Sequence, residues 1–186
     1  MTTARRLHYT YEEYLAVEEL SELRHEYLDG EIYAMAGGTP EHAALAARVL
    51  LEIGSKLSEC TPLTSDLRVR AEATGLTTYP DASFVCGPAL RSAIDKTAVT
   101  NPTVLVEVTS PSTEDYDRGD KLSHYKQIPS VRAVLIVSHA TPRVTVVERE
   151  GASWRTTDFR SGERVRVASP AVEFDVDTIY AALKNL

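Results

Sequence analysis

The sequence has only two cysteines and five histidines among its 186 residues. Cys60 and Cys86 are far apart and form no Cys-x-x-Cys pair, which argues against a disulfide framework or a zinc finger. The histidines, at positions 8, 25, 42, 124 and 139, also lack the spacing of a zinc site. We therefore expect a reducing, cytoplasmic setting and no structural zinc.

Long hydrophobic runs are absent as well. No run approaches the roughly 20 apolar residues that a membrane-spanning helix needs. Residues 1–14 contain basic side chains with no apolar stretch after them, so we expect no signal peptide. There is no repeat, low-complexity segment or long linker, and the composition is that of an ordinary soluble protein. We expect one domain over residues 1–186 and no membrane partner.

The chain has fewer positive than negative side chains: 20 lysines and arginines against 27 aspartates and glutamates, which gives a formal net charge of −7. This balance argues against binding to nucleic acid through bulk charge. It does not exclude a local basic patch, or a site at which a metal ion supplies the positive charge.

Several catalytic motifs are missing. A Ser-His-Asp hydrolase of the nucleophile-elbow type needs a G-x-S-x-G motif, which does not occur. Gly37 and Gly38 lie in neither a Walker motif nor a dinucleotide-binding fingerprint. A glycosidase can use paired carboxylates, but the single tryptophan leaves little for stacking sugars.

The front half of the chain contains clear helix and turn signals. Thr10 and Glu13 form a capping box that opens a helix reaching about Glu19. Asp29-Gly30 between two apolar-rich arms predicts a hairpin. A long helix begins after Thr39 and Pro40. Its predicted apolar face consists of Ala43, Ala47, Leu50, Leu51 and Leu57.

The remaining elements alternate between strands and helices. We expect strands near 64–70, 78–86 and 103–109, a helix over 115–128 and a buried strand over 131–138. The segments "RVTVVERE" and "ASWRTTDF" predict a hairpin, and a short helix begins near 177. The order indicates a mixed α/β or α+β domain.

Two of these strands carry an acid where a core residue is expected. Asp81 lies in "YPDASFV" and Glu107 in "VLVEVTS". Alternation directs Val104, Val106 and Val108 to one face of the strand and Leu105, Glu107 and Thr109 to the other. Burying a lone carboxylate costs on the order of several kcal/mol unless a cation or hydrogen-bond donor pairs with it. Glu107 therefore either meets an arginine or lysine in a structural ion pair, lies at the strand end near water, or belongs to a site. Asp81 alone is weaker evidence, because Pro-Asp often starts a strand.

Taken together, the two acids indicate more. If their strands pair, Asp81 and Glu107 lie close enough to repel each other unless they share a proton or a cation. Mg²⁺ or Mn²⁺ is satisfied by such a pair with a carbonyl, here that of Val108, and water. Lys121 on the following helix can reach the same place. This constellation suits phosphodiester hydrolysis. Without the ion, we expect alanine at either acid to leave the protein at least as stable as the wild type.

The sequence also resembles a known family. "YPD", "PTVLVEVTSPST" and "YDRGDKLSHYKQIPSVRAVLIV", in this order, resemble the Uma-type family of restriction endonucleases, within the PD-(D/E)xK nuclease superfamily. "YTYEEYLAVE" and "RHEYLDGEIYAMAGGTPEH" match as well, so the resemblance runs from about Tyr9 to Tyr180. It implies a restriction-endonuclease-like core, a central mixed β-sheet flanked by helices.

The resemblance also implies roles for single residues. Asp81 matches the acid of the PD motif, and Glu107 the acid of the (D/E)xK motif. The superfamily's lysine would fall at 109, where this chain has Thr109, and the family's lysine lies on the next helix, at Lys121. Glu26 matches the additional acid of such nucleases, and His42 a histidine at the start of the long helix.

Each of these residues also has a simpler interpretation. Glu26 can be an exposed hairpin acid, His42 a surface or capping residue, and Lys121 a solvated lysine in a charged run. Asp117 and Tyr125 lie one turn before and after Lys121 on the predicted helix. Asp117 can pair with the lysine or cap the helix, and Tyr125 suits packing.

Two hypotheses of different classes follow. The first is a Mg²⁺- or Mn²⁺-dependent endonuclease that cleaves duplex DNA. The second is a nuclease-fold protein that no longer cuts and serves as a nucleic-acid-binding or interaction module. We further expect a homodimer, since a duplex has two strands and the segments "VRAVLIV" and "RVTVVE" offer more apolar edge than a small sheet needs.

Overall fold

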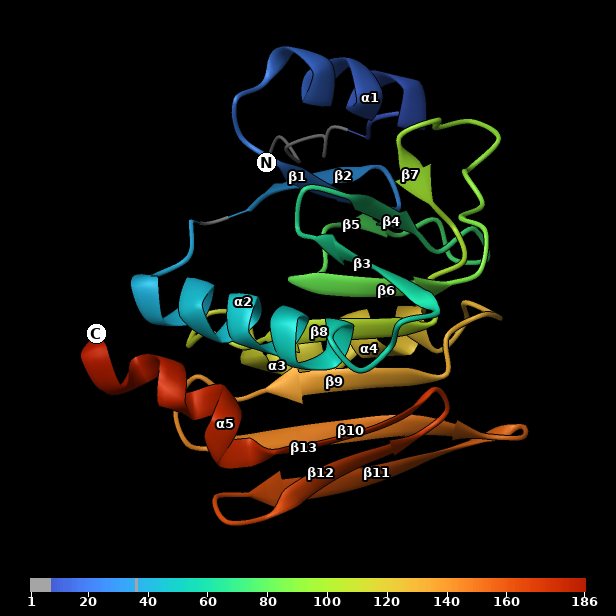
Figure 1. Ribbon diagram of the computed structural model, residues 1–186. Coiled ribbons are helices and arrows are strands. Elements are labelled where there is room, and N and C mark those ends of the chain that lie inside the picture. The colour runs from blue at the N-terminus through green and yellow to red at the C-terminus, as the bar shows by residue number, and fades with distance from the viewer. Residues whose placement is uncertain (1–7, 36) are drawn as a thin grey trace, which may run out of the picture.

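Two β-sheets dominate the computed structural model, which describes residues 8–35 and 37–186 (Figure 1). The larger sheet has six strands in the order β11-β10-β9-β8-β6-β3, and only its β8–β9 pair is parallel. Its strands are β3 (Cys60–Thr64), β6 (Ala82–Cys86), β8 (Val104–Val108), β9 (Ala133–Val137), β10 (Arg143–Glu150) and β11 (Ser153–Arg160).

A second sheet of five strands lies above the first in Figure 1, in the order β2-β1-β5-β4-β7. Its strands are β1 (His25–Leu28), β2 (Glu31–Ala34), β4 (Arg68–Arg70), β5 (Thr77–Thr78) and β7 (Ala98–Val99). The β1–β2 turn confirms the predicted hairpin: Asp29 and Gly30 have φ angles of 47° and 79°, the positive values that such a two-residue turn requires. A separate hairpin joins β12 (Arg164–Ala168) to β13 (Ala171–Asp175).

The two N-terminal helices begin where the sequence predicts. Helix α1 (Tyr11–Leu20) has the complete Thr10–Glu13 capping box, and α2 (Pro40–Gly54) is capped by the Thr39 hydroxyl. The buried stripe of α2 is Leu45, Val49 and Ile53, at i, i+4 spacing, with Leu57 beyond its end. The predicted face was wrong at Ala43, Ala47 and Leu51, which are exposed to solvent, whereas Leu50 packs against the core as expected.

The predicted helix over 115–128 is two short helices, α3 (Glu114–Arg118) and α4 (Asp120–Tyr125). Gly119 separates them with non-helical angles (φ −103°, ψ −101°), and a Cβ at this position would lie 2.8 Å from the Asp115 carbonyl oxygen. Only glycine fits such an approach. The chain ends in α5 (Val176–Tyr180) and a 3₁₀ turn, η1 (Ala181–Asn185).

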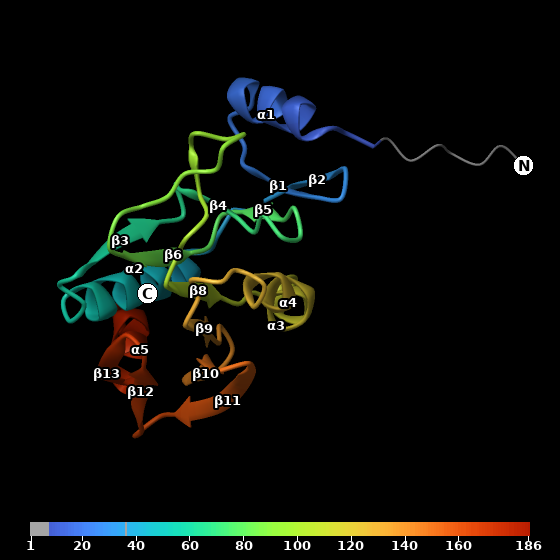
Figure 2. The same cartoon turned by 90° about the vertical axis from the view of Figure 1, so that its right-hand side faces the viewer.

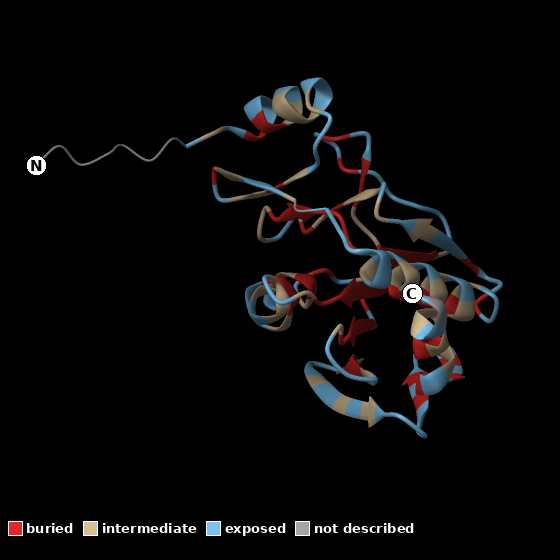
Figure 3. Cartoon of the chain, turned by 90° about the vertical axis from the view of Figure 1, so that its left-hand side faces the viewer, coloured by how far each residue is buried: buried red, intermediate tan, exposed pale blue. Residues whose placement is uncertain are grey.

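Helices cover both faces of the six-stranded sheet, as Figure 2 shows. On one face, α2, α5 and the β12–β13 hairpin pack on Phe84, Val106 and Leu135. On the other face, α4 and the segment after it pack on Leu105 and Ile136. The inner strands are buried on both faces, whereas β11 is largely exposed (Figure 3). Glu107 shares its side of β8 with Leu105, so it faces α3 and α4.

The apolar segments behind the dimer expectation do not form an edge. Strands β9 and β10 are paired on both sides, and the edges of this sheet are β11 and β3. That argument from the sequence was therefore wrong, because the valine-rich strands bury their side chains in the protein's own core.

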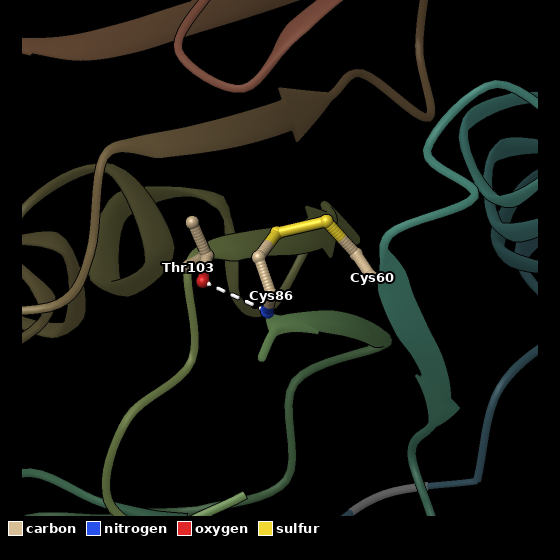
Figure 4. Close-up of a disulfide and its surroundings, with 3 residues drawn as sticks. All are labelled: Cys60, Cys86 and Thr103. Carbon is tan, nitrogen blue, oxygen red and sulfur yellow. Dashed lines mark hydrogen bonds between the residues drawn. A yellow bond between two sulfur atoms is a disulfide. The ribbon is translucent and has the colours of Figure 1, made fainter. Parts of the chain in front are cut away.

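Cys60 and Cys86 form a disulfide, contrary to the sequence-based expectation (Figure 4). They are 26 residues apart in sequence, but the antiparallel pairing of β3 with β6 places them directly opposite each other. Thr103 accepts a hydrogen bond from the Cys86 amide at the same position. The cysteines therefore give no support to a reducing compartment.

In the described part of the chain, no helix has the length and apolar character needed to cross a bilayer.

Candidate active site

Strands β6 and β8 bring the two acids together. They pair antiparallel with Ala82 opposite Val106, and the next step of this register places Asp81 beside Glu107. Ala82 and Phe84 face the α2 side of the sheet, so Asp81 faces the α3–α4 side, as Glu107 does. The condition set from the sequence, that the two strands pair, is confirmed.

Glu107 is enclosed by polar partners. It is buried, it accepts a hydrogen bond of 2.5 Å from the Tyr125 hydroxyl, and its Oε1 lies 3.0 Å from Lys121 Nζ. Burial raises the pKa of Glu107 to about 8, while Lys121 opposes this shift and Asp81 and Asp117 add to it. Burial thus disfavours the charged form of this carboxyl group, and Lys121 favours it.

Lys121 projects from α4 into the same cluster, with only 6% of its side chain exposed. Its Nζ lies 3.1 Å from Glu26 and 3.6 Å from Asp117, in addition to Glu107. Burial alone would lower the pKa of Lys121, but the surrounding acids, Glu107 first, raise it well above its usual value. The lysine is thus a buried cation shared by three carboxyl groups. Its interpretation as a solvated lysine was wrong.

Glu26 reaches the cluster from β1. It is buried rather than exposed on the hairpin, and it accepts a hydrogen bond from the Thr78 hydroxyl on β5. Tyr116 of α3 lies near it, and burial, with the Glu26 carboxylate, raises the pKa of the Tyr116 phenol. Thr78 and Tyr116 were not identified from the sequence, although Thr78 lies three residues before Asp81 and Tyr116 directly precedes Asp117.

Asp81 and His42 form the more exposed side of the site. Asp81 accepts a 2.7 Å hydrogen bond from the Val108 amide and lies 3.4 Å from His42 Nε2. His42 Nε2 is also 2.9 Å from the Val108 carbonyl oxygen. The hydrogen bond to Asp81 raises the pKa of His42. Their side chains are 17% and 23% exposed, so the cluster is open to solvent beside the beginning of α2.

The position of the superfamily's lysine has a different use here. Thr109 is fully buried, and its hydroxyl lies 2.9 Å from His139 Nδ1 and accepts a hydrogen bond from the His139 amide. A lysine at this position would disrupt both contacts. The buried cation beside Glu107 therefore comes from α4, as Lys121.

The structure brings all seven candidate side chains together: Glu26, His42, Asp81, Glu107, Asp117, Lys121 and Tyr125. Two of them make the contacts that the sequence led us to expect. Asp117 does pair with Lys121, and Tyr125 is both packed in the core and hydrogen-bonded to Glu107. Glu107 does lie in an ion pair, but that ion pair belongs to a cluster of four acids and is not an isolated structural contact.

The donor set fits a hard divalent cation. The cluster contains four carboxyl groups and one lysine, and oxygen atoms are the ligands that Mg²⁺ prefers. A carbonyl oxygen has two lone pairs, so Val108 retains capacity beyond its contact with His42. Within residues 8–35 and 37–186, no group of three or more His, Cys, Asp or Glu side chains is arranged to hold a metal. An ion bound here would also need a main-chain carbonyl and water as ligands.

The protonation of Glu107 leads to a prediction about stability. In the metal-free protein, we expect the free energy of unfolding to fall as the pH rises from about 4.5, the ordinary pKa of this group, to about 8, its pKa in the folded chain. Over this range the folded state holds a proton that the unfolded state has lost. The stabilisation from this proton is therefore complete below the unfolded pKa and is lost as the pH rises through the folded pKa. His42, with a raised pKa, acts in the same direction.

Urea denaturation at a series of pH values, with a chelator present, measures this dependence. Glu107→Gln has a neutral group at every pH and should show a smaller fall, with the part due to His42 remaining. An unchanged pH dependence in this variant would contradict the assignment.

Comparison with known proteins places the chain in a sequence family. The model of the Uma2 family, described as "Putative restriction endonuclease", matches residues 11–179. Two curated proteins of Synechocystis sp. are similar, and both are described as uncharacterized. One, slr1290, is 35% identical over 92% of this chain and 91% of its own length. The other, sll1609, is 30% identical over 83% of this chain and 89% of its own length.

A solved structure shares the fold. A protein from Anabaena variabilis, described as "a putative nuclease belonging to DUF820", superposes with a TM-score of 0.73 at 19% identity, over 92% of this chain and 97% of that one. The restriction-endonuclease-like fold, a mixed sheet flanked by helices, is therefore confirmed.

Proposed function

Because the chain belongs to the Uma2 family, we propose that it is a metal-dependent endonuclease that hydrolyses phosphodiester bonds in duplex DNA. The observation that carries this proposal is the buried cluster in which Lys121 lies within 3.1 Å of both Glu26 and Glu107. Asp81 stands beside Glu107 in the register of β6 and β8. A protein that only bound nucleic acid would have no use for so many acids at one point.

In the proposed reaction, Asp81, Glu107 and the Val108 carbonyl hold Mg²⁺ or Mn²⁺. When bound, the ion lowers the pKa of a water molecule and takes up negative charge on the phosphate. Lys121 stabilises the charge that builds on the phosphate oxygens as water attacks. A new bond forms between phosphorus and the water oxygen as the water gives up a proton to solvent. The bond from phosphorus to the leaving oxygen breaks, and this oxygen takes up a proton from solvent.

The remaining residues hold these groups in place. Tyr125 orients Glu107 through its hydroxyl, and Thr78 does the same for Glu26. His42 orients Asp81 and the Val108 carbonyl at once. Asp117 completes the acidic surroundings of Lys121. This division assigns Asp81, Glu107, Lys121 and Glu26 to the reaction and the other side chains to positioning.

Cleavage of supercoiled plasmid DNA tests the proposal. We expect nicked or linear product with Mg²⁺ or Mn²⁺ and none with a chelator, because the four acids then lack the ion that allows an anionic substrate to approach. Glu107→Gln serves as the matched inactive control. Absence of metal-dependent cleavage by the folded wild-type protein, with DNA binding retained, would instead support the non-cutting binding module.

Two further expectations accompany this function. The homodimer stays a prediction and now rests only on the need to cut two strands, since the apolar edge that also favoured it is buried. A cytoplasmic location also stays a prediction, because the disulfide removes the argument from the cysteines.

A further inference from the structure

Two cations lie against the Trp154 ring at the far end of α4, and a third lies beside one of them. The Arg149 guanidinium stacks on the Trp154 ring, 4.4 Å from its centroid, and Lys126 Nζ lies 6.0 Å from the same centroid. Arg149 and Trp154 are directly paired across β10 and β11. The Arg149 amide donates to the Arg132 carbonyl, so Arg132 lies beside them. We call Lys126, Arg132, Arg149 and Trp154 the basic cluster.

Arg149 is fixed in place by the backbone. Its side chain donates to the carbonyl oxygens of Val131, Lys126 and Ile128, at 2.9–3.0 Å. These bonds cap the chain where it leaves α4, so Arg149 has a structural use. Lys126 and Arg132 differ: in the described part of the chain neither side chain makes a hydrogen bond.

The positive charge of the cluster is not neutralised. None of the three cations forms an ion pair with a carboxylate among the described residues. Burial and the neighbouring Arg132 both lower the pKa of Arg149, which shows like charges held together. In a chain with seven more acids than bases, such a group stands out. Holding like charges together is unfavourable, and an anionic partner would offset it.

The basic cluster lies on the same face of the six-stranded sheet as the candidate active site. Trp154 packs against the core that contains Leu105, Leu122 and Tyr125, and Figure 2 shows α3 and α4 on this side. The Arg132 amide donates to the Thr103 carbonyl, and Glu107 is four residues further along the chain, which is about 13 Å along a strand. Each strand of a DNA duplex presents a phosphate about every 3.4 Å along the axis. This separation therefore spans about four phosphates of one strand.

We propose that the basic cluster is a binding surface for the phosphate backbone of the DNA strand that enters the candidate active site. The proposal rests on the proposed function for the identity of the partner. Lys126 and Arg132 supply free cationic side chains, while Arg149 and Trp154 hold them in position at the end of α4. The contact is with phosphate and carries no sequence information.

Salt dependence of DNA binding tests this surface. The probe is a fluorescein-labelled duplex of mixed sequence, titrated with metal-free protein and followed by anisotropy over a range of salt concentrations. For the double variant Lys126→Gln, Arg132→Gln, we expect the slope of log K against log salt to become shallower by about 1.8, or about 0.9 for each lost phosphate contact. Affinity at low salt should fall with it.

The matched control is Arg164→Gln, Arg166→Gln, which removes the same charge from exposed arginines on β12 that already pair with Glu173 and Asp175. Its slope should stay close to that of the wild type. An unchanged slope in the Lys126→Gln, Arg132→Gln variant, or an equal change in both variants, would contradict the proposal that the basic cluster binds DNA phosphates. Wild-type cleavage is measured separately. A shallower slope in the double variant, together with no cleavage by the wild type, would contradict the proposed nuclease function but support the DNA-binding surface.

Discussion

Glu107→Gln is expected to abolish metal-dependent cleavage. The loss should be well beyond the roughly 10–100-fold that follows removal of a group that only orients a metal ligand. Glutamine keeps the size of the side chain and an oxygen that accepts from Tyr125, but it cannot provide an anionic ligand. Burial disfavours the charged form of Glu107 and raises its pKa, so a neutral amide is tolerated at this position. The variant should therefore still fold, with Lys121 retaining Glu26 and Asp117 as partners.

Asp81 needs a different substitution. From the sequence we expected alanine at this position to leave the metal-free protein at least as stable. In the structure, however, Asp81 accepts a hydrogen bond from the Val108 amide and contacts His42. Alanine would leave that amide without its partner, at a cost of about 1–3 kcal/mol. Asp81→Asn keeps an acceptor and is the cleaner test. Calorimetry that finds wild-type Mn²⁺ affinity in both Asp81→Asn and Glu107→Gln would contradict the proposed ligands.

Lys121→Met is expected to lower the rate of cleavage by about 10²-fold or more, as for the loss of one preorganised electrostatic donor. Methionine retains the length and helix propensity of lysine but no charge. The measurement is single-turnover cleavage at saturating DNA and metal, so that binding does not limit the rate. Mn²⁺ affinity should stay the same or rise, because a nearby positive charge repels the ion.

The same substitution should also destabilise the protein. Lys121 is buried among Glu26, Glu107 and Asp117, and removing one partner of a buried ion pair typically costs about 3–5 kcal/mol. The rate must therefore be measured where circular dichroism shows the variant folded. Lys56→Met is the control, since Lys56 forms only a surface pair with Glu52. A folded Lys121→Met protein that cleaves at the wild-type rate would reject the assignment.

Local sequence patterns were sufficient for β8, which carries Glu107, whereas the strand expected over 78–86 is split into β5 and β6, with Asp81 in the bend just before β6. Alternation in "VLVEV" correctly separated Glu107 from Val104, Val106 and Val108, since each face of β8 packs on a different core. The Asp29-Gly30 turn and the Thr39 cap were also predictable, because each depends on residues close together in sequence. These are the features that place Glu26, His42 and Glu107.

Features that depend on distant partners were beyond the sequence. The disulfide arises from the pairing of β3 with β6, which no local pattern encodes. Thr78 and Tyr116 contribute only because β5 and α3 come to lie beside Glu26. The break at Gly119 depends on its close approach to Asp115, and an uninterrupted helix was the natural expectation for that segment.

A crystal structure with Mn²⁺ tests the central claim most directly. The account predicts one ion, located by anomalous scattering, that is bound by a carboxylate oxygen of Asp81, one of Glu107 and the main-chain oxygen of Val108, at distances of about 2.1 Å. Lys121 should remain within reach of the phosphate position, without contact to the ion. An ion held by other residues, or no ion between Asp81 and Glu107 in a protein that cleaves DNA with Mn²⁺, would contradict it.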